Sequence, residues 1–529
     1  MRKLLLWVGI PLLLITTVFI FRDNGEGQAS GGNILASLDK IRTILSIVRE
    51  YYVEEPDLDK LVDAGISGML QELDPHSTYI PASELQQVNE EFRGDFDGIG
   101  IYFEIRNKLI TVVSAIPGTP SDRLGLSPGD MIVEIEGESA YGFTNDQVQK
   151  KLKGPRGSVV NITVRRPGLD ETLDFSITRE KIPIYSVDSA FMLDDRTGYI
   201  RLTRFSATSE EEVVAALDSL EAQGMTQLLF DLRGNTGGFL QQAFKLADLF
   251  LPGGQTIVST RGRLKQFDES LVSTDETTRP RWPVVMMINQ GSASASEILS
   301  GAIQDLDRGL VVGETSFGKG LVQRQFDFND TSAVRVTIAR YYTPSGRLIQ
   351  RPYDGGLMDY YREGYDDVDN NLDEDSTAVK PVYYTRAGRK VYGGGGITPD
   401  VRIRGGRLTP YLSRLRTNRV FFDWANERWT EPGPERNRLQ AAGFESFLTG
   451  WQPDEALIEE VRLLADAKVP FVAEDWEKDI HWVKAYIKRE MARVIWGRDE
   501  SRRVDSADDP VIVESLLLFD EAARIARLK

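Results

Sequence analysis

A run of small residues at positions 289–298, Asn-Gln-Gly-Ser-Ala-Ser-Ala-Ser-Glu-Ile, has the composition expected around a serine nucleophile. The apolar run Val284–Ile288 predicts a buried strand before it, and the pattern from Ser294 to about Gln304 predicts a helix after it. A serine at the start of a helix lies beside free backbone N–H groups and the positive end of the helix dipole. That position suits a nucleophile whose attack creates an oxyanion. The same serines would also serve as plain helix caps, so the segment alone leaves both interpretations open.

A second segment, Gly313–Gln323, places Lys319 between two glycines after a short predicted strand. A serine nucleophile needs a base that is neutral at the working pH, and a lysine can act as one when desolvation lowers its pKa. An anion-binding loop or a solvated lysine is the alternative for this segment taken alone. The phosphate-binding pattern of nucleotide hydrolases is not met, because Gly320 rather than Ser or Thr follows the lysine.

A third segment, Asp231–Gly238, has the sequence Asp-Leu-Arg-Gly-Asn-Thr-Gly-Gly and lies between a predicted buried strand and a predicted helix. Its two final glycines, Gly237 and Gly238, are able to aim backbone N–H groups into a site. A tight strand-to-helix turn is the simpler alternative, and a glycine pair by itself does not decide between them.

Taken together, the three segments resemble the carboxyl-terminal processing peptidases, a family of Ser–Lys serine proteases. Further matching motifs are LDPHSTYI at 73–80, YYTPSGRLIQ at 341–350 and GGITPDV at 395–401. The resemblance covers roughly residues 35 to 402, with the motifs in the family's order. It implies a serine endopeptidase that needs no metal and no organic cofactor.

The resemblance also implies a role for each matching residue. Ser294 would be the nucleophile and Lys319 the general base, with Gln323 orienting the lysine. Glu297 occupies a family position near the site and would help to set the environment of the lysine.

The oxyanion hole implied by the resemblance uses backbone N–H groups. One would come from Ala295, and the other from Gly237 or Gly238.

Residues 92–180 separately resemble a PDZ domain. The loop that would bind a terminal carboxylate is Gly98-Ile99-Gly100-Ile101, and the stretches 117–126 and 128–130 match the pattern that follows it. In such a domain a glycine loop captures the C-terminal carboxylate through N–H groups, and the peptide adds to the sheet as a strand. The expected partners are therefore protein or peptide substrates with exposed C-termini. A β-rich domain without a peptide role is the alternative.

The chain has no cysteine and only two histidines, His76 and His481. Disulfides, thiolate metal sites and cysteine nucleophiles are therefore excluded. A Ser-His-Asp mechanism is disfavoured, with His76 expected to be structural and His481 a packed or surface residue. An EF-hand loop counted from Asp367 is also disfavoured, because its sixth position is Leu372 instead of glycine. We expect no metal site.

The N-terminus predicts export. Arg2 and Lys3 precede an apolar run from Leu4 to Phe21, which is typical of a signal peptide or a single membrane anchor. The basic flank keeps that side in the cytoplasm, so the rest is expected in the periplasm or cell envelope. The net charge of −17 disfavours nucleic acid as a partner.

The sequence predicts a multidomain α+β protein with a crotonase/ClpP-like α/β peptidase core, an inserted β-rich PDZ domain and helical N- and C-terminal regions. Ser209 with Glu212 predicts a capping box at the start of one core helix. Three C-terminal helices are expected over 454–465, 478–495 and 510–527. The predicted parts are a signal or anchor at 1–22, a linker at 23–34, a helical region at 35–91, the PDZ domain at 92–180, the peptidase core at 181–405 with an acidic insertion at 364–379, and the C-terminal helices at 406–529.

Two other functions stay open at this point. A catalytically silent PDZ scaffold of the cell envelope is the first, although Ser294, Lys319 and Gln323 are all present. An acyl-CoA enzyme is the second, because the family core resembles the crotonase fold, but the PDZ pattern and the export signal argue against it. An adaptor or activator, a homo-oligomer, and a dimerisation or docking role for residues 406–529 are further expectations.

Overall fold

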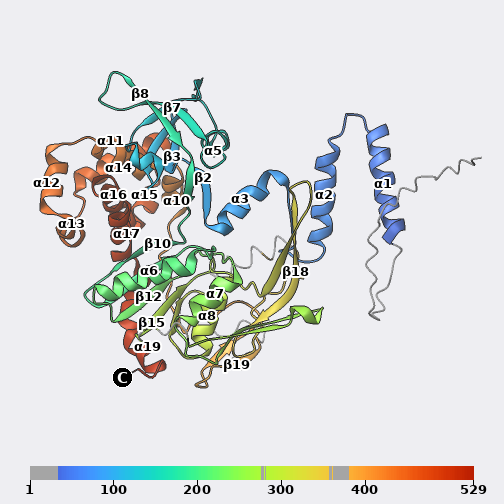
Figure 1. Cartoon of the computed structure of the whole chain (residues 1–529). Coiled ribbons are helices and arrows are strands. Elements are labelled where there is room, and N and C mark those ends of the chain that lie inside the picture. Colours follow the sequence, from blue (N-terminus) through green and yellow to red (C-terminus); the bar gives the residue numbers. More distant parts are fainter. Residues whose placement is uncertain are drawn as a thin grey trace, which may run out of the picture. The chain divides into compact units, whose positions relative to one another are not determined.

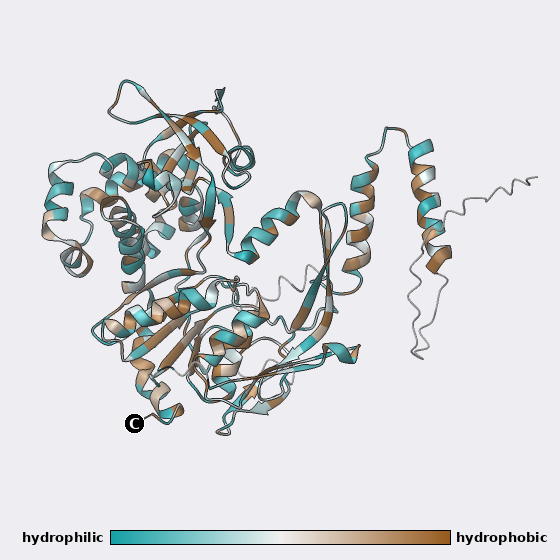
Figure 2. Cartoon of the chain, in the orientation of Figure 1, coloured by the Kyte–Doolittle hydropathy of each residue, from teal (hydrophilic) through white to brown (hydrophobic). Residues whose placement is uncertain are grey.

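The computed structural model describes residues 34–275, 279, 281–354, 356, 360 and 380–528. The chain divides into two compact units, Met1–Gly68 and Met69–Lys529. Helix α1 (Ile34–Tyr51) and helix α2 (Leu58–Gln71) follow the predicted helical periodicity, and neither contains a buried residue. Figure 2 shows apolar residues along both helices. None of the described helices is long and apolar enough to cross a membrane, and the predicted signal or anchor at 1–22 lies outside the described residues.

The second unit contains a β-rich domain near its start. Its sheet has the antiparallel order β3-β4-β5-β7-β8, with β6 paired to β5 and helix α5 beside it. Ile110, Ile132 and Val148 are fully buried in its core. The β-rich sequence runs 109–113, 131–135, 159–164 and 173–177 predict strands, and β4, β5, β7 and β8 confirm these predictions. The elements are β2 (Asp95–Gly98), β3 (Ile101–Arg106), β4 (Leu109–Ala115), α4 (Pro120–Arg123), β5 (Met131–Ile135), β6 (Glu138–Ser139), α5 (Asn145–Leu152), β7 (Val159–Arg165), β8 (Thr172–Thr178) and β9 (Glu180–Pro183).

The predicted peptidase core contains a six-stranded sheet of order β10-β11-β12-β15-β16-β21. The strands from β11 onward are parallel, and β10 runs antiparallel to β11. Helices α6, α7 and α8 connect its strands, as the alternating sequence pattern predicts. The bounds are β10 (Val187–Met192), β11 (Thr197–Leu202), α6 (Ser209–Ala222), β12 (Gln227–Asp231), α7 (Leu240–Asp248), β15 (Val284–Ile288), α8 (Ala295–Asp305), β16 (Leu310–Gly313) and β21 (Val401–Arg402).

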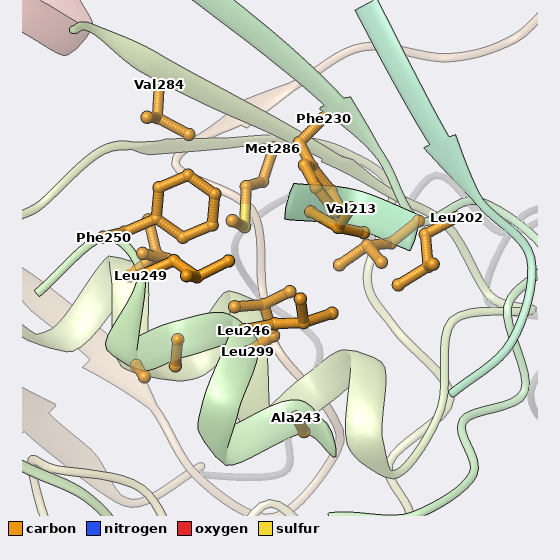
Figure 3. Close-up of a cluster of buried hydrophobic side chains, with 14 of the residues drawn as sticks. Leu202, Val213, Phe230, Ala243, Leu246, Leu249, Phe250, Val284, Met286 and Leu299 are labelled. Carbon is orange, nitrogen blue, oxygen red and sulfur yellow. The ribbon is translucent and has the colours of Figure 1, made fainter. Parts of the chain in front are cut away.

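Both faces of this sheet are buried. Phe230 and Met286 pack with α6, α7 and α8 on one face (Figure 3), whereas their neighbours Leu229 and Val285 point to the other face. That second face is covered by α18 (Pro510–Ser515) and α19 (Phe519–Ile525), the last helices of the chain (Figure 1). Continuous apolar strands such as 284–288 are the sequence signature of a sheet covered on both sides.

A second, five-stranded sheet lies in the order β1-β18-β13-β14, with β17 also paired to β18. Strand β1 (Thr78–Ile80) falls in the region 35–91 that we predicted to be helical, and it pairs with β18 more than 250 residues away. Local periodicity does not reveal so distant a partner. The remaining elements of this part are α3 (Ala82–Arg93), β13 (Thr256–Gly262), η1 (Lys265–Phe267), β14 (Glu269–Val272), β17 (Leu321–Asp327), β18 (Ala333–Tyr342), β19 (Val382–Tyr384) and β20 (Lys390–Tyr392).

The C-terminal region is helical, as predicted, but one helix differs. The pattern predicts a continuous helix over 510–527, whereas the 3₁₀ turn η2 (Leu516–Leu518) separates α18 from α19. The other helices are α10 (Pro410–Thr417), α11 (Val420–Trp429), α12 (Pro434–Ala442), α13 (Phe444–Gly450), α14 (Glu455–Lys468), α15 (Ala473–Lys478), α16 (Ile480–Ile495) and α17 (Arg498–Ala507).

The predicted capping box of Ser209 and Glu212 is wrong. Thr208 is the residue before helix α6, and its hydroxyl donates to Glu212. The other carboxylate oxygen of Glu212 accepts from the backbone N–H groups of Ser186 and Val187. The side chain of Glu212 therefore makes tertiary hydrogen bonds with Ser186 and Val187 instead of the predicted capping box with Ser209.

Candidate active site

Ser294 occupies a strained turn between strand β15 and helix α8. Its backbone has φ 54° and ψ −110°, a region that residues with a side chain rarely adopt. The turn holds this conformation because its neighbours are anchored, with Ser292 Oγ donating to Leu232 O at 2.8 Å and Ala293 N donating to Asn235 O at 3.0 Å. Strain of this kind, at the junction of a buried strand and a helix, is typical of turns that carry a nucleophilic serine.

The carboxylate of Glu297 joins this turn to the lysine loop. Glu297 is fully buried, and its oxygens accept from the backbone N–H of Ser294 at 2.7 Å and of Lys319 at 2.9 Å. They also accept from Gly318 N at 2.7 Å and Ser316 Oγ at 2.5 Å. Burial raises the pKa of Glu297 to about 7, although the four hydrogen bonds oppose that rise. One carboxylate thus fixes the distance between the two backbone segments that carry Ser294 and Lys319.

Lys319 is largely buried, and its Nζ donates to Gln323 Oε1 at 2.8 Å. Burial, together with the nearby charge of Arg335, lowers the pKa of Lys319 from 10.5 to about 8, while Glu297 and Asp74 act in the opposite direction. In the described part of the chain, no hydrogen bond joins Nζ to Ser294 Oγ. A lysine with this pKa supplies a neutral amine near neutral pH.

The hydroxyl of Tyr341 links the same two segments from the other side. Its oxygen lies 2.6 Å from the carbonyl oxygen of Lys319 and 3.1 Å from that of Ser294. Tyr341 is 1% exposed, so this bridge is shielded from water.

The glycine turn lies directly against Ser294. A Cβ atom on Gly237 would lie 2.9 Å from Ser294 Cβ and 3.0 Å from Ala295 N, so no larger residue fits there. Gly237 N already donates to Asn235 Oδ1 at 2.9 Å. By contrast, the N–H groups of Gly238 and Ala295 have no acceptor among the described residues. Of the two glycines that the sequence leaves open, Gly238 is therefore the one with an available donor.

A second anchor of this turn comes from the end of the chain. The guanidinium of Arg233 pairs with Asp231 at 2.8 Å and with Asp509 at 2.8 Å. Asp231 is fully buried and also accepts from Tyr199 Oη at 2.8 Å. Burial acts to raise the pKa of Asp231, but the charge and hydrogen bonds of Arg233 hold that pKa below its usual value. Asp509 caps helix α18, with its side chain accepting from Val511 N. Sequence reasoning did not identify this contact, because its partners are 276 residues apart.

His76 lies beside the lysine, a position that the sequence did not predict. Its carbonyl oxygen accepts from Gln323 Nε2, and its ring Nε2 lies 2.7 Å from Tyr360 Oη. Burial and the charge of Lys319 lower the pKa of His76 to about 4, so the ring is neutral at neutral pH. His481 is exposed in the C-terminal helices, with its ring 4.9 Å from that of Trp482.

The predicted carboxylate loop of the PDZ-like domain lines a cleft that Leu152 and Lys153 also line. Gly100 has φ 81°, and a Cβ atom there would lie 2.3 Å from Thr119 Oγ1, so the loop requires glycine. The N–H groups of Ile99 and Gly100 have no acceptor among the described residues, while the carbonyls of the same two residues accept from Ser121 and Ile116. Two adjacent unpaired amides suit an anionic group.

The described residues contain no cluster of three or more His, Asp or Glu side chains that could hold a metal ion. The disfavoured EF-hand loop from Asp367 lies outside the described residues.

Comparison with known proteins identifies the class of protein to which the chain belongs. Three family models match the chain: Peptidase family S41 over residues 196–357, PDZ domain over 111–166, and Activating protease CtpB N-terminal domain over 21–83. A serine-type peptidase with a PDZ domain is the class that these matches define. The PDZ match begins after the loop 98–101, so it does not include the residues predicted to bind a carboxylate.

Among curated proteins, the carboxy-terminal-processing protease of Bartonella bacilliformis is 39% identical over 327 residues, covering 60% of this chain and 74% of the relative. The carboxy-terminal processing protease CtpA of Bacillus subtilis is 33% identical over 372 residues, covering 69% and 78%. Among solved structures, the photosystem II D1 C-terminal processing protease is 26% identical, with a TM-score of 0.36, and the match covers 70% of this chain and 87% of that chain. The chain belongs to the carboxy-terminal processing protease family.

Proposed function

We propose that this peptidase uses Ser294 as its nucleophile and Lys319 as its general base. The observation that carries the proposal is the pair of hydrogen bonds from the backbone N–H groups of Ser294 and Lys319 to Glu297. These bonds join the strained turn of Ser294 to the loop of a lysine whose pKa is lowered by burial. Gln323 accepts from the lysine and orients it. Perturbed titratable groups that converge on a strained serine are typical of catalytic sites.

The chemistry follows from these groups. Neutral Lys319 takes the hydroxyl proton as Ser294 Oγ bonds to the scissile carbonyl carbon, and the N–H groups of Ala295 and Gly238 stabilise the oxyanion. The C–N bond then breaks, and the leaving amine takes the proton from the lysine. Water attacks the resulting ester with Lys319 again as base, which restores the free serine.

The PDZ-like domain selects the substrate in this proposal. The amides of Ile99 and Gly100 bind the terminal carboxylate, and the peptide pairs with the edge of β3, whose only paired strand among the described residues is β4. The chain of the substrate then leads from that edge to the serine. We also propose that the protein is exported and acts in the periplasm or cell envelope, on the basis of the basic and apolar N-terminal sequence.

The test is proteolysis of an unfolded, fluorescein-labelled protein with an apolar C-terminal residue. The fragment from residue 34 is compared with its Ser294→Ala and Lys319→Ala variants and with the double variant. We expect each single change to abolish turnover almost completely and the double change to cost little more, because the two residues act as one unit. Equal cleavage by all four proteins would refute the assignment. Cleavage by the wild type and the Lys319→Ala variant, but by neither protein that lacks Ser294, would identify another base.

The carboxylate contact is tested separately by peptide binding. A peptide that ends in a free carboxylate should bind more tightly than the same peptide with a C-terminal amide. If peptide binding persists while no protein cleaves, the chain is either a PDZ scaffold with a silent peptidase core or a resting enzyme that needs an activator.

A further inference from the structure

The bond from Gln323 to the carbonyl oxygen of His76 fixes how the glutamine faces the lysine. A carbonyl oxygen only accepts, so the Nε2 amide nitrogen must face His76. The amide oxygen Oε1 is then left facing Lys319 Nζ, which lies 2.8 Å away. The opposite orientation would place the amide oxygen against the carbonyl oxygen of His76, which are two acceptors with no hydrogen between them. The backbone of His76 therefore decides whether the lysine has an acceptor.

That carbonyl belongs to a segment that is held by one buried carboxylate. Asp74 is 7% exposed, and its Oδ1 accepts from the N–H groups of His76 and Ser77 at 2.8 Å each. Its Oδ2 accepts from Ser77 Oγ at 2.7 Å. Three bonds to a single side chain set the turn over residues 74–77, and with it the direction of the His76 carbonyl.

The same turn is fastened next to the glutamine. Ser77 Oγ accepts from Thr337 N at 3.2 Å, and Thr337 is the residue that pairs with Gln323 across strands β17 and β18. The following residue, Thr78, starts the pairing of β1 with β18. The position of the carbonyl is therefore fixed relative to the strand that carries the glutamine.

We propose that Asp74 is a positioning residue for the general base, acting through the turn 74–77 and the amide of Gln323. Removal of its carboxylate releases the His76 carbonyl, after which Gln323 no longer holds Lys319 in its buried position. This inference rests on the proposed function, in which Lys319 is the base. It assigns a task to the motif at 73–80, which precedes the residues matched by the peptidase model.

The pKa of Lys319 distinguishes a positioning role of Asp74 from a direct effect of its negative charge on the lysine. The charged or titratable groups that act on it are Arg335 on β18, Glu297 on α8, and Asp74 and His76 on the turn. Loss of the Asp74 charge alone would lower the pKa of Lys319, because that carboxylate favours the ammonium form. Release of the lysine to water would raise the pKa instead, since burial is the largest cause of its depression. The two effects therefore have opposite signs.

The experiment is competitive acetylation of lysines by trace acetic anhydride as a function of pH, with Lys319 followed by peptide mass spectrometry. The parent is the Ser294→Ala protein, so the result does not depend on turnover. The first variant is Asp74→Asn. The second is Ser77→Ala, which removes one bond of the turn without changing a charge and replaces Asp74→Asn in the test if that variant does not fold. Glu72→Gln is the matched control, because Glu72 is exposed and two residues away.

We expect half-maximal acetylation of Lys319 near pH 8 in the parent and in the control. In Asp74→Asn and Ser77→Ala it should move upward by about one pH unit or more, toward the ordinary lysine value. An unchanged or lower midpoint in both folded variants would overturn the inference.

A rate measurement on the active protein is a second, independent test. Asp74→Asn should lower kcat about tenfold or more with little change in KM. In a Gln323→Ala background the same change should cost less than about twofold, because the aspartate acts through the glutamine. Fully additive losses would contradict the inference while leaving the Ser–Lys proposal intact. A wild type that is as inactive as Ser294→Ala would count against the proposed function, and the acetylation midpoints would still test the role of Asp74.

Discussion

The buried lysine makes pH a direct probe of the proposed chemistry. Lowering the pKa of Lys319 from 10.5 to about 8 corresponds to roughly 3.4 kcal/mol in favour of the neutral amine. At pH 7 about a tenth of the molecules then carry a neutral base, against roughly one in three thousand for an ordinary lysine. Because the base must be deprotonated, kcat/KM should fall as the pH falls through 8 and level off above about pH 9.

Arg335 gives a way to move that midpoint. Its charge is the second largest cause of the lowered pKa of Lys319, so Arg335→Gln should raise the pKa and shift the pH profile upward. Activity at pH 7 should fall several-fold, while the plateau at high pH stays the same. Arg324→Gln is the matched control, since Arg324 is exposed on the neighbouring strand β17.

The assay is the initial rate of cleavage of the labelled unfolded protein from pH 5.5 to 10, with circular dichroism to verify folding at each pH. A midpoint near 7 would point to Glu297 as the titrating group, because burial raises the pKa of Glu297 to about 7. A profile that stays flat down to pH 5 would fit His76, whose pKa is about 4. Either result would refute the assignment of Lys319 as the base.

Three further outcomes test other parts of the structure. Gly238→Ala should lower kcat/KM about a hundredfold or more, because the new Cβ atom would lie 2.1 Å from Phe205 O and the φ of this residue is 151°. Gly433→Ala is the control and should not change the kinetics, because a Cβ atom there would meet no atom within 4 Å. Phe519→Ala should reduce the free energy of unfolding, measured by urea titration, by about 3–5 kcal/mol, because Phe519 packs on the sheet and is only 4% exposed. Leu517→Ala is the control: its side chain is 81% exposed, so the change should stay within about 0.5 kcal/mol. Glu297→Gln should lower kcat at neutral pH by at least about tenfold even if the protein folds, because the new amide N–H₂ would face backbone donors that now bond to the carboxylate. Unaltered kinetics would show that this carboxylate does not hold the segments of Ser294 and Lys319 in their active positions.

Local sequence was sufficient for much of the fold. Strand β5 begins and ends where the pattern of residues 131–135 predicts, and α8 begins one residue after the expected start at Ser294. These elements combine a short apolar run with clear turn or cap residues, so neighbouring residues contain the information. The order of the motifs also predicts that Ser294 and Lys319 belong to one site.

The parts that the sequence did not predict depend on partners far along the chain. Strand β1 exists because Thr78–Ile80 pairs with β18, and the helical pattern before it gave no indication of that partner. His76 was expected to be structural, yet its backbone reaches Gln323 across the same pairing. The break at Leu516–Leu518 follows from packing of both short helices on the sheet, which overrides a helical pattern of Pro510–Arg527. Tertiary contacts of this kind leave no local periodicity to detect.

The cover that α18 and α19 provide has a consequence for synthesis of the chain. Every strand of the six-stranded sheet leaves the ribosome before these helices, so one apolar face of the sheet stays uncovered until residues 510–525 emerge. Arg233 likewise meets Asp509 only at that stage. Such distant closure favours slow, late folding and exposure to chaperones during translation. We expect nascent chains that end before residue 509 to remain protease-sensitive in the peptidase core, so that the site assembles only after α18 and α19 have been synthesised.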